Sequence, residues 1–222
     1  LDDTLAWRPE GPVTVRDFLA DALATSRVLP PGDWVLNLCE NRYSFAVVFA
    51  ACLLAGKTSL QPASQTNQTL LKLGQDYSGV FYVADGPHDL VGLPRMDYPD
   101  LSTMERPLVN DIPGLPGNRL VAILFTSGST GLPQPHGKTW GKLVLNGRAE
   151  AQALGLLNTG TVLVGTVPVQ HSYGFESTFL LALHGGCSFW SGKPFYPQDV
   201  IDALQAVPRP RRLVTTPYHL SA

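Results

Sequence analysis

The chain has 222 residues and a mass of 24.0 kDa, which is enough to bury a sizeable core in one large or two small domains. A formal net charge of -2 and a pI near 6.2 exclude a strongly basic protein that would attract nucleic acid or an anionic membrane surface over long range. Only 15% of the residues are charged, against roughly 25% in an average soluble domain. This shortage favours strands buried on both faces, or a surface that further protein covers.

The first predicted elements alternate between helix and strand. Thr14 and Asp17 have the spacing of a capping box, and apolar residues then follow at helical spacing as far as residue 23. An apolar run at 34–38, an apolar helix over 44–55 and a brief strand at 58–61 have the lengths of a strand–helix–strand unit. Such a unit implies parallel strands and a right-handed crossover. A helix near 68–75 and a strand at 80–84 follow.

The second half repeats this rhythm after a stretch rich in proline and glycine. Residues 86–117 form that stretch and are the best candidate boundary, which divides the chain into regions 1–115 and 116–222. A buried strand at 120–126 precedes a loop and a long helix over 138–156. A second unit follows, made of a strand at 161–167, a helix over 176–184 that ends at two glycines, and a strand at 187–190. The expected fold class is therefore α/β, with parallel-rich sheets flanked by helices in two similar layers.

The last predicted elements are short. Residues 213–216 are strand-like, Thr216 suits the N-cap of a helix, and Pro217 suits its first position. Too few residues follow for a stable helix, which needs two or three turns. We therefore expect the chain to be a piece of a longer protein.

Cysteine usage and hydropathy indicate the compartment. Cys39, Cys52 and Cys187 each lie in an apolar stretch and lack C-x-x-C spacing, so buried, reduced thiols are expected. No charged leader precedes an apolar segment, and the longest apolar run, 45–55, is far shorter than the roughly 20 residues that span a bilayer. These features predict a cytoplasmic protein without a membrane span.

The loop after the strand at 120–126 has the chemistry of a phosphate site. Between Thr126 and Gly131, glycines let backbone N–H groups approach an anion, and hydroxyl side chains add further donors. The positive end of the helix predicted to follow adds to the attraction. A Ser/Gly-rich surface turn is the simpler alternative. It is disfavoured because the predicted flanking elements place the loop at the carboxyl end of a parallel strand, where open α/β sheets bind ligands.

Two other motifs fit less well. Residues 137–139 (Gly-Lys-Thr) could end a Walker A loop, but Gly131 lies six positions before Gly137, where that motif requires five. Prolines stiffen the intervening segment, and no downstream apolar strand ends in a metal-binding Asp. Residues 184–186 (His-Gly-Gly) are similar to an oxyanion-hole sequence, yet the chain contains no G-x-S-x-G nucleophile motif. A helix C-terminus is the better interpretation of these residues.

Residues 124–133, Leu-Phe-Thr-Ser-Gly-Ser-Thr-Gly-Leu-Pro, resemble the phosphate loop of the adenylate-forming superfamily almost residue for residue. That superfamily includes acyl- and aryl-CoA synthetases, luciferases and the adenylation domains of peptide synthetases. Residues 53–56 with 60–62 are similar to its early Ala-Gly and Pro motif, and residues 168–174 are similar to the segment that lines its acyl pocket. The resemblance covers essentially the whole chain. Residues 133–140 are similar to a branch of AMP-ligases from aryl-polyene and xanthomonadin pigment clusters.

This resemblance implies an AMP-forming carboxylic acid ligase. Such enzymes join a fatty or aryl acid to ATP with Mg²⁺, release pyrophosphate, and pass the acyl group to the thiol of CoA or of the phosphopantetheine on an acyl carrier protein. The superfamily's later motifs, which carry a magnesium-binding Glu, a ribose-binding Asp and a catalytic Lys, have no counterparts here. The chain is thus expected to be an N-terminal portion, without a complete catalytic set and inactive alone. A stand-alone nucleotide-binding or interaction module is the alternative.

The resemblance assigns two sets of candidate residues. The ATP phosphates are expected to contact Thr126, Ser127, Gly128, Ser129, Thr130, Gly131, Gln134 and Lys138, with Thr130 as a weak metal ligand. The acyl-substrate pocket is expected to contain His171, Ser172, Tyr173 and Gly174.

Some of these positions leave alternatives open. The superfamily usually has Lys where this chain has Gln134, and Lys138 either reaches back to the phosphates from the helix start or is a solvated helix residue. His171 could cap the strand at 161–167, but its match to the superfamily's position favours the pocket. His136 and His219 match nothing in the superfamily and are interpreted as loop residues.

Overall fold

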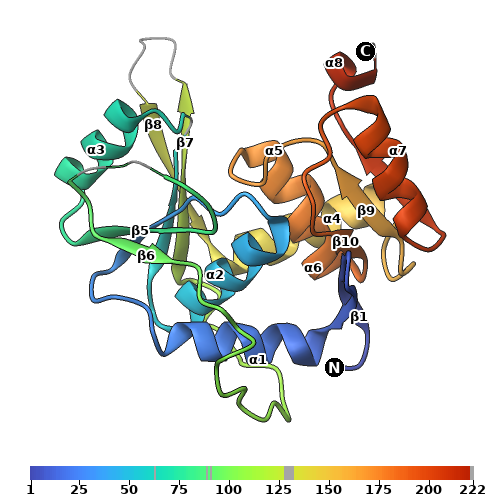
Figure 1. Ribbon diagram of the computed structural model, residues 1–222, viewed down its shortest axis with the longest axis horizontal. Coiled ribbons are helices and arrows are strands. Elements are labelled where there is room, and N and C mark those ends of the chain that lie inside the picture. The colour runs from blue at the N-terminus through green and yellow to red at the C-terminus, as the bar shows by residue number, and fades with distance from the viewer. Residues whose placement is uncertain (63, 89, 91, 128–132, 221–222) are drawn as a thin grey trace. The chain divides into compact units, whose positions relative to one another are not determined.

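The computed structural model describes residues 1–62, 64–88, 90, 92–127 and 133–220. Contacts divide the chain into two compact units. Unit 1 comprises Leu1–Phe18, Asn41–Tyr43 and Lys142–Ala222, and unit 2 comprises Leu19–Glu40 and Ser44–Gly141. Each unit contains one β-sheet (Figure 1).

Unit 2 is built on a six-stranded sheet in the order β6-β5-β3-β4-β7-β8. Neighbouring strands are parallel except β7 and β8, which are antiparallel. Helix α2 (Arg42–Leu54) connects β3 to β4, and these two strands are parallel as predicted. The strands are β3 (Trp34–Asn37), β4 (Thr58–Gln61), β5 (Val80–Ala84), β6 (Arg95–Asp97), β7 (Leu120–Ser127) and β8 (Pro133–Thr139).

Helix α3 (Asn67–Asp76) packs against this sheet with its apolar face (Figure 1). Thr66 caps its first turn, because the threonine hydroxyl accepts a hydrogen bond from the Thr69 N–H. Fully burying an apolar side chain of leucine size contributes about 1.5–3 kcal/mol, so the buried helix leucines hold α3 in place. The core that they share with the strands includes Leu36, Leu60, Leu70, Leu73, Tyr82, Ile123 and Phe125.

Helix α1 (Val15–Ser26) begins with the predicted capping box. The Asp17 N–H donates to Thr14 Oγ1 at 3.1 Å, and the Thr14 N–H donates to Asp17 Oδ2 at 3.3 Å. Two backbone donors that a helix start leaves without partners are therefore satisfied. Helix α2 ends at Leu54, and Gly56 follows with a φ of +83°, a conformation that favours glycine.

Unit 1 contains a five-stranded sheet in the order β11-β9-β10-β1-β2. The first two strands along the chain, β1 and β2, form an antiparallel hairpin that the sequence patterns did not indicate. β1 also pairs in parallel with β10. β9 and β10 are parallel, as expected of a second strand–helix–strand unit. The strands are β1 (Thr4–Arg8), β2 (Gly11–Thr14), β9 (Val162–Gly165), β10 (Ser188–Trp190) and β11 (Arg211–Val214).

A composite helix joins β9 to β10. It starts as α5 (Ser172–Gly174), continues as a π-helix over Phe175–Leu180 and ends as α6 (Leu181–Gly185). Gly186 follows with a φ of +70°, which confirms the predicted glycine C-terminus.

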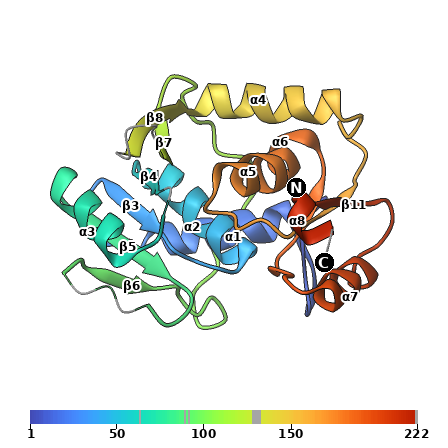
Figure 2. The same ribbon diagram turned by 90° about the horizontal axis from the view of Figure 1, so that it is seen from above.

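The described part of unit 1 also contains residues of α4, α7 and α8. α4 (Trp140–Ala153) runs alongside the composite helix (Figure 2), and Gly147 lies where a side chain would meet the Leu180 carbonyl oxygen. α7 (Pro197–Ala206) was not predicted, and Ala203 from it packs with the strand residues Val162 and Val164. α8 (Pro217–Leu220) begins at the expected proline.

The loop predicted to join a strand to a helix instead joins two antiparallel strands. β8 includes Lys138, which the sequence pattern places at a helix start, and α4 begins only at Trp140. The predicted helix start is therefore wrong. Pro133 and Pro135 stand within β8, which is possible because β8 is an edge strand and needs hydrogen bonds on one side only.

The two compact units group the chain differently from regions 1–115 and 116–222. β7 lies after residue 115, yet it pairs with β4 from Ser59↔Ala122 to Gln61↔Leu124. The Pro/Gly-rich stretch 86–117 contains β6 and belongs to unit 2. Strand pairing thus places the β7–β8 hairpin in the sheet of the first half.

The three cysteines are free and buried, as the sequence predicts. Burial raises the pKa of the Cys39, Cys52 and Cys187 thiols. In the part of the chain that the structure describes, no helix combines the length and the apolar composition needed to cross a membrane.

Candidate functional site

The predicted phosphate loop includes the residues that follow β7 and precede β8 in the sequence. Residues 128–132 are outside the described residues, so the predictions for Gly128, Ser129, Thr130 and Gly131, including a metal ligand at Thr130, concern positions that the structure does not describe. The backbone of Ser127 ends β7, and that of Pro133 begins β8.

Thr126 is the predicted phosphate residue on β7 whose side chain the structure describes. It is exposed and pairs in register with Gln134 across the hairpin. Its Oγ1 lies 3.1 Å from Nε2 of His136, within hydrogen-bond distance. His136 is therefore a strand residue next to the candidate site, and its interpretation as a loop residue is wrong. The interpretation of His219 as a loop residue is also wrong, because it lies in α8, where its Nδ1 is 3.1 Å from Thr216 Oγ1.

Gln134, His136 and Lys138 share one face of β8, because side chains alternate along a strand. Lys138 lies four residue steps beyond Gln134, or about 13 Å at a rise of 3.3–3.4 Å per residue. Lys138 is thus well removed from the loop along the strand. Helix α4 also begins after β8 and not directly after the loop, so the positive end of its dipole does not follow the loop in the sequence as expected. The phosphate role of Lys138 remains a prediction.

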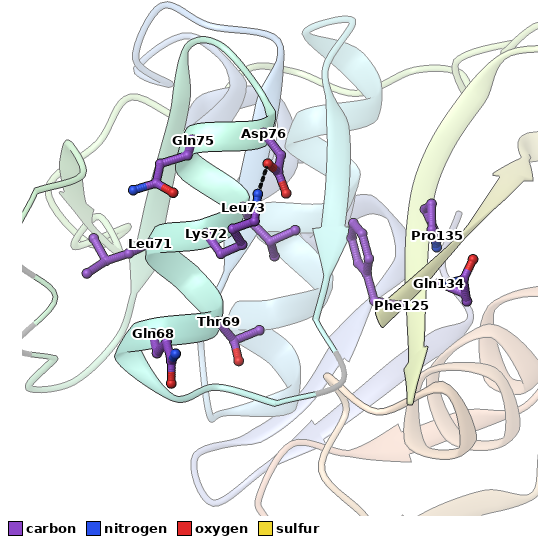
Figure 3. A pocket seen from close by; sticks show the side chains of 10 residues that line it. All are labelled: Gln68, Thr69, Leu71, Lys72, Leu73, Gln75, Asp76, Phe125, Gln134 and Pro135. Carbon is purple, nitrogen blue, oxygen red and sulfur yellow. Dashed lines mark hydrogen bonds and ion pairs between the residues drawn. The ribbon is translucent and has the colours of Figure 1, made fainter. Parts of the chain in front are cut away.

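A hollow of about 860 Å³ opens beside the hairpin, between α3 and the strands β7 and β8 (Figure 3). Its walls are mostly carbon. Among the described residues that line it, the cation is Lys72, which is paired with Asp76 of the same helix. The hollow therefore has the character of an apolar pocket more than of a phosphate site. It is lined by Gln68, Thr69, Leu71, Lys72, Leu73, Gln75, Asp76, Phe125, Gln134 and Pro135.

The second candidate segment forms a tight turn between β9 and the composite helix. The His171 N–H donates to the Pro168 carbonyl at 3.1 Å, and the Phe175 N–H donates to the His171 carbonyl at 2.8 Å. His171, Ser172 and Tyr173 are exposed. The side chain of His171 makes no hydrogen bond that caps the helix it precedes, and its backbone is extended (φ -83°, ψ 146°).

Tyr173 and Gly174 fix this turn to its surroundings. The Tyr173 hydroxyl donates to the Thr215 carbonyl at 3.2 Å, just after β11. Gly174 is buried, and a Cβ at this position would overlap the Pro168 carbonyl oxygen. Glycine is required there because the backbone of the turn passes too close for any side chain.

Arg42 is a buried charge next to this turn that the sequence patterns did not single out. Its side chain is 1% exposed, and its guanidinium donates to four carbonyl oxygens in unit 1. Burial lowers its pKa to about 10, so it remains a cation at neutral pH. Its position in the sequence was the one available indication of burial, because this arginine precedes the strongly apolar stretch 45–55.

Among the described residues, no cluster of three or more His, Cys, Asp or Glu side chains could hold a metal ion.

No protein-family model matches the sequence, and no curated protein matches it either. Solved structures do match. The o-succinylbenzoate CoA synthetase MenE from Bacillus subtilis, in complex with ATP and magnesium ion, has a TM-score of 0.74 and 18% identity, covering 92% of this chain and 57% of its own. ATP-bound MatB from Rhodopseudomonas palustris has a TM-score of 0.73 and 19% identity, covering 92% of this chain and 45% of its own.

MbtA from Mycobacterium smegmatis, solved without ligand, has a TM-score of 0.73 and 20% identity, covering 91% of this chain and 43% of its own. The chain thus spans about half the length of the solved structures that it matches. At these identities the likeness shows the fold. The predicted fold, that of the N-terminal portion of adenylate-forming enzymes, is confirmed.

Proposed function

We propose that this chain is the N-terminal portion of an AMP-forming carboxylic acid ligase. One observation carries the proposal. The ten-residue motif at 124–133 includes the end of β7 and the start of β8, in a fold shared with an o-succinylbenzoate CoA synthetase solved with ATP. The sequence motif and the matching fold both support the proposal, and the fold match holds at only 17–20% sequence identity.

In the proposed reaction, the loop and Thr126 bind the β- and γ-phosphates of ATP while a carboxylate oxygen attacks the α-phosphorus and pyrophosphate leaves. The attacking carboxylate and the phosphates are both anionic, so the protein contributes positioning and neutralisation of charge. Mg²⁺ would supply part of that neutralisation on the phosphate oxygens. We assign it no ligands from the described residues, since none of them form a suitable cluster.

The acid would bind near the turn at residues 168–174. His171 and Ser172 are exposed and offer two polar side chains to a carboxylate, while Tyr173, whose hydroxyl donates to the Thr215 carbonyl, and Gly174 would shape the wall of the site. The acid is proposed to be a fatty or an aryl acid. The acyl group would then pass to CoA or to the phosphopantetheine of an acyl carrier protein. The three buried free thiols fit the reducing cytoplasm proposed for the enzyme.

Pyrophosphate exchange tests this function. The product of the complete reading frame is assayed with ATP and a panel of fatty and aryl acids, while ATP binding is measured by calorimetry. Exchange that depends on one acid class is the expected result. ATP binding without exchange for any acid would contradict the ligase and favour the nucleotide-binding module. The 222-residue chain assayed alone is expected to show no exchange.

Two variants connect the activity to the loop. Ser129→Ala removes one hydroxyl from the proposed phosphate site, and losing a hydrogen bond to a charged group costs about 1.5–3 kcal/mol. We expect exchange to fall by roughly ten- to a hundredfold. Ser78→Ala, at an exposed position of the same unit, is the matched control and should leave exchange unchanged. An equal loss of exchange in the two variants would mean that the loop has no specific part in the activity.

A further inference from the structure

Arg42 sits at the first position of α2, and its guanidinium is enclosed by the ends of two strands. Nη1 donates to the carbonyls of Trp190 at 3.1 Å and Gly192 at 2.6 Å. Nη2 donates to the carbonyls of Gly165 at 3.2 Å and Val167 at 3.1 Å. One side chain thereby connects the carboxyl ends of β9 and β10.

Arginine is the one residue type that suits this position. A fully buried charge is costly unless hydrogen bonds replace its lost water. The planar fork of five N–H donors can serve four carbonyl oxygens at once, whereas a lysine ammonium has three donors. The backbone also adapts to the guanidinium, because a Cβ at Gly165 would lie 3.0 Å from Arg42 Nη2 and 2.9 Å from Thr178 Oγ1.

The hydrogen bonds of Arg42 continue directly into the turn that carries His171. Val167 accepts from Arg42, and the next residue, Pro168, accepts from the His171 N–H. Gly174, at the far side of the turn, lies against the carbonyl oxygens of Val167 and Pro168. The backbone of the turn is therefore held from the β9 side by Arg42 and from the helix side by Gly174.

We propose that Arg42 is a positioning residue for acid binding, because it fixes the turn that presents His171, Ser172 and Tyr173. Arg42 is buried and does not itself contact the acid. This inference rests on the proposed function, in which the turn binds the carboxylate. Arg42, the charged residue at the start of α2, thereby has a role in substrate affinity. None of the motifs recognised in the sequence includes this residue.

Hydrogen exchange and kinetics on the same variants test the inference. Arg42→Met retains much of the side-chain volume and removes all four hydrogen bonds, and Arg42→Lys retains the charge but cannot serve four acceptors. Arg27→Met, which alters an exposed arginine at the end of α1, is the matched control. Amide exchange is measured by mass spectrometry, with peptides from 166–175 compared with peptides from β7.

In Arg42→Met, we expect amide protection over 166–175 to fall by about tenfold or more while β7 stays protected, with a smaller loss in Arg42→Lys. The KM for the acid should rise by roughly tenfold while the KM for ATP stays within about twofold. Arg27→Met should change neither quantity. If Arg42→Met does not fold, Arg42→Lys provides the same two readouts.

Two results would overturn the inference. One is unchanged protection over 166–175 in a folded Arg42 variant, which would show that the turn does not depend on the guanidinium. The other is an equal rise in the KM values for acid and ATP, which would indicate general loosening of the protein. Failure of the proposed function gives a different pattern, because the wild-type protein would then show no acid-dependent exchange whatever the protection measured in the variants.

Discussion

Replacing Gln134 with lysine should strengthen ATP binding if the β7–β8 turn holds phosphates. Gln134 is exposed and pairs with Thr126, so a lysine there would extend from the second described residue after the loop. A charge-assisted hydrogen bond to phosphate contributes about 1.5–3 kcal/mol. Because position 134 is exposed, we expect the lower end, about 1.5 kcal/mol, which corresponds to a roughly tenfold lower Kd for ATP.

Calorimetric titration of ATP into the product of the complete reading frame measures this change. The matched control is Ser78→Lys, which adds the same charge to unit 2 at an exposed position that does not line the hollow beside the hairpin. A gain that comes from a specific contact should appear at position 134 alone. It should also shrink as salt is added, because an exposed charge is screened.

Two outcomes would refute the reasoning. A Kd within about twofold of wild type for Gln134→Lys would mean that the phosphates do not lie near the base of the hairpin. An equal gain for Ser78→Lys would mean that net charge, and not the site, governs the affinity.

Three further predictions concern stability and are checked by urea unfolding. Thr14→Ala should lower the free energy of unfolding by about 1 kcal/mol, because the cap of α1 is lost. Gly174→Ala should cost about 1–3 kcal/mol through overlap with the Pro168 carbonyl, whereas Gly114→Ala, where a Cβ meets open space, should be close to neutral. Burial lowers the pKa of His184 to about 4 from 6.5, so the unfolded state binds more protons between these values. The unfolding free energy should therefore fall as the pH drops from about 6.5 to 4, and His184→Gln should flatten that dependence.

The elements that could be predicted from the sequence are those whose cause is local. The capping box of α1 depends on two side chains three residues apart, and the structure contains both of its hydrogen bonds. The parallel units around α2 and the composite helix follow from apolar periodicity, element length and a closing glycine. Such patterns are complete within a short window, so no distant residue is needed to read them.

The missed elements depend on partners that are far away in the chain. β1 pairs with β10 at Ala6↔Phe189, and no pattern near residue 6 indicates that partner. β8 was mistaken for a loop and a helix start because its prolines argue against a strand unless the strand is known to be at an edge. α7 is a different case, since Pro197 and Asp199 at its start were a readable signal.

The candidate site divides in the same way. The phosphate motif could be recognised because it is a continuous stretch of sequence. The pair formed by Thr126 and His136 could not, because it depends on the register of an antiparallel hairpin. Arg42 was also missed, because its four acceptors are main-chain carbonyls, which every residue has and no sequence pattern marks.

Both edges of the sheet in unit 2 carry features that oppose uncontrolled association. At one edge, β8 contains two prolines and the basic side chain of Lys138, and at the other, β6 is three residues long with an ion pair between Arg95 and Asp97 at 2.6 Å. Open strand edges are templates for aggregation, and short strands, prolines and charges are the means by which proteins block them. The sheet that carries the candidate nucleotide site is thus protected from adding strands of neighbouring molecules beside its hairpin.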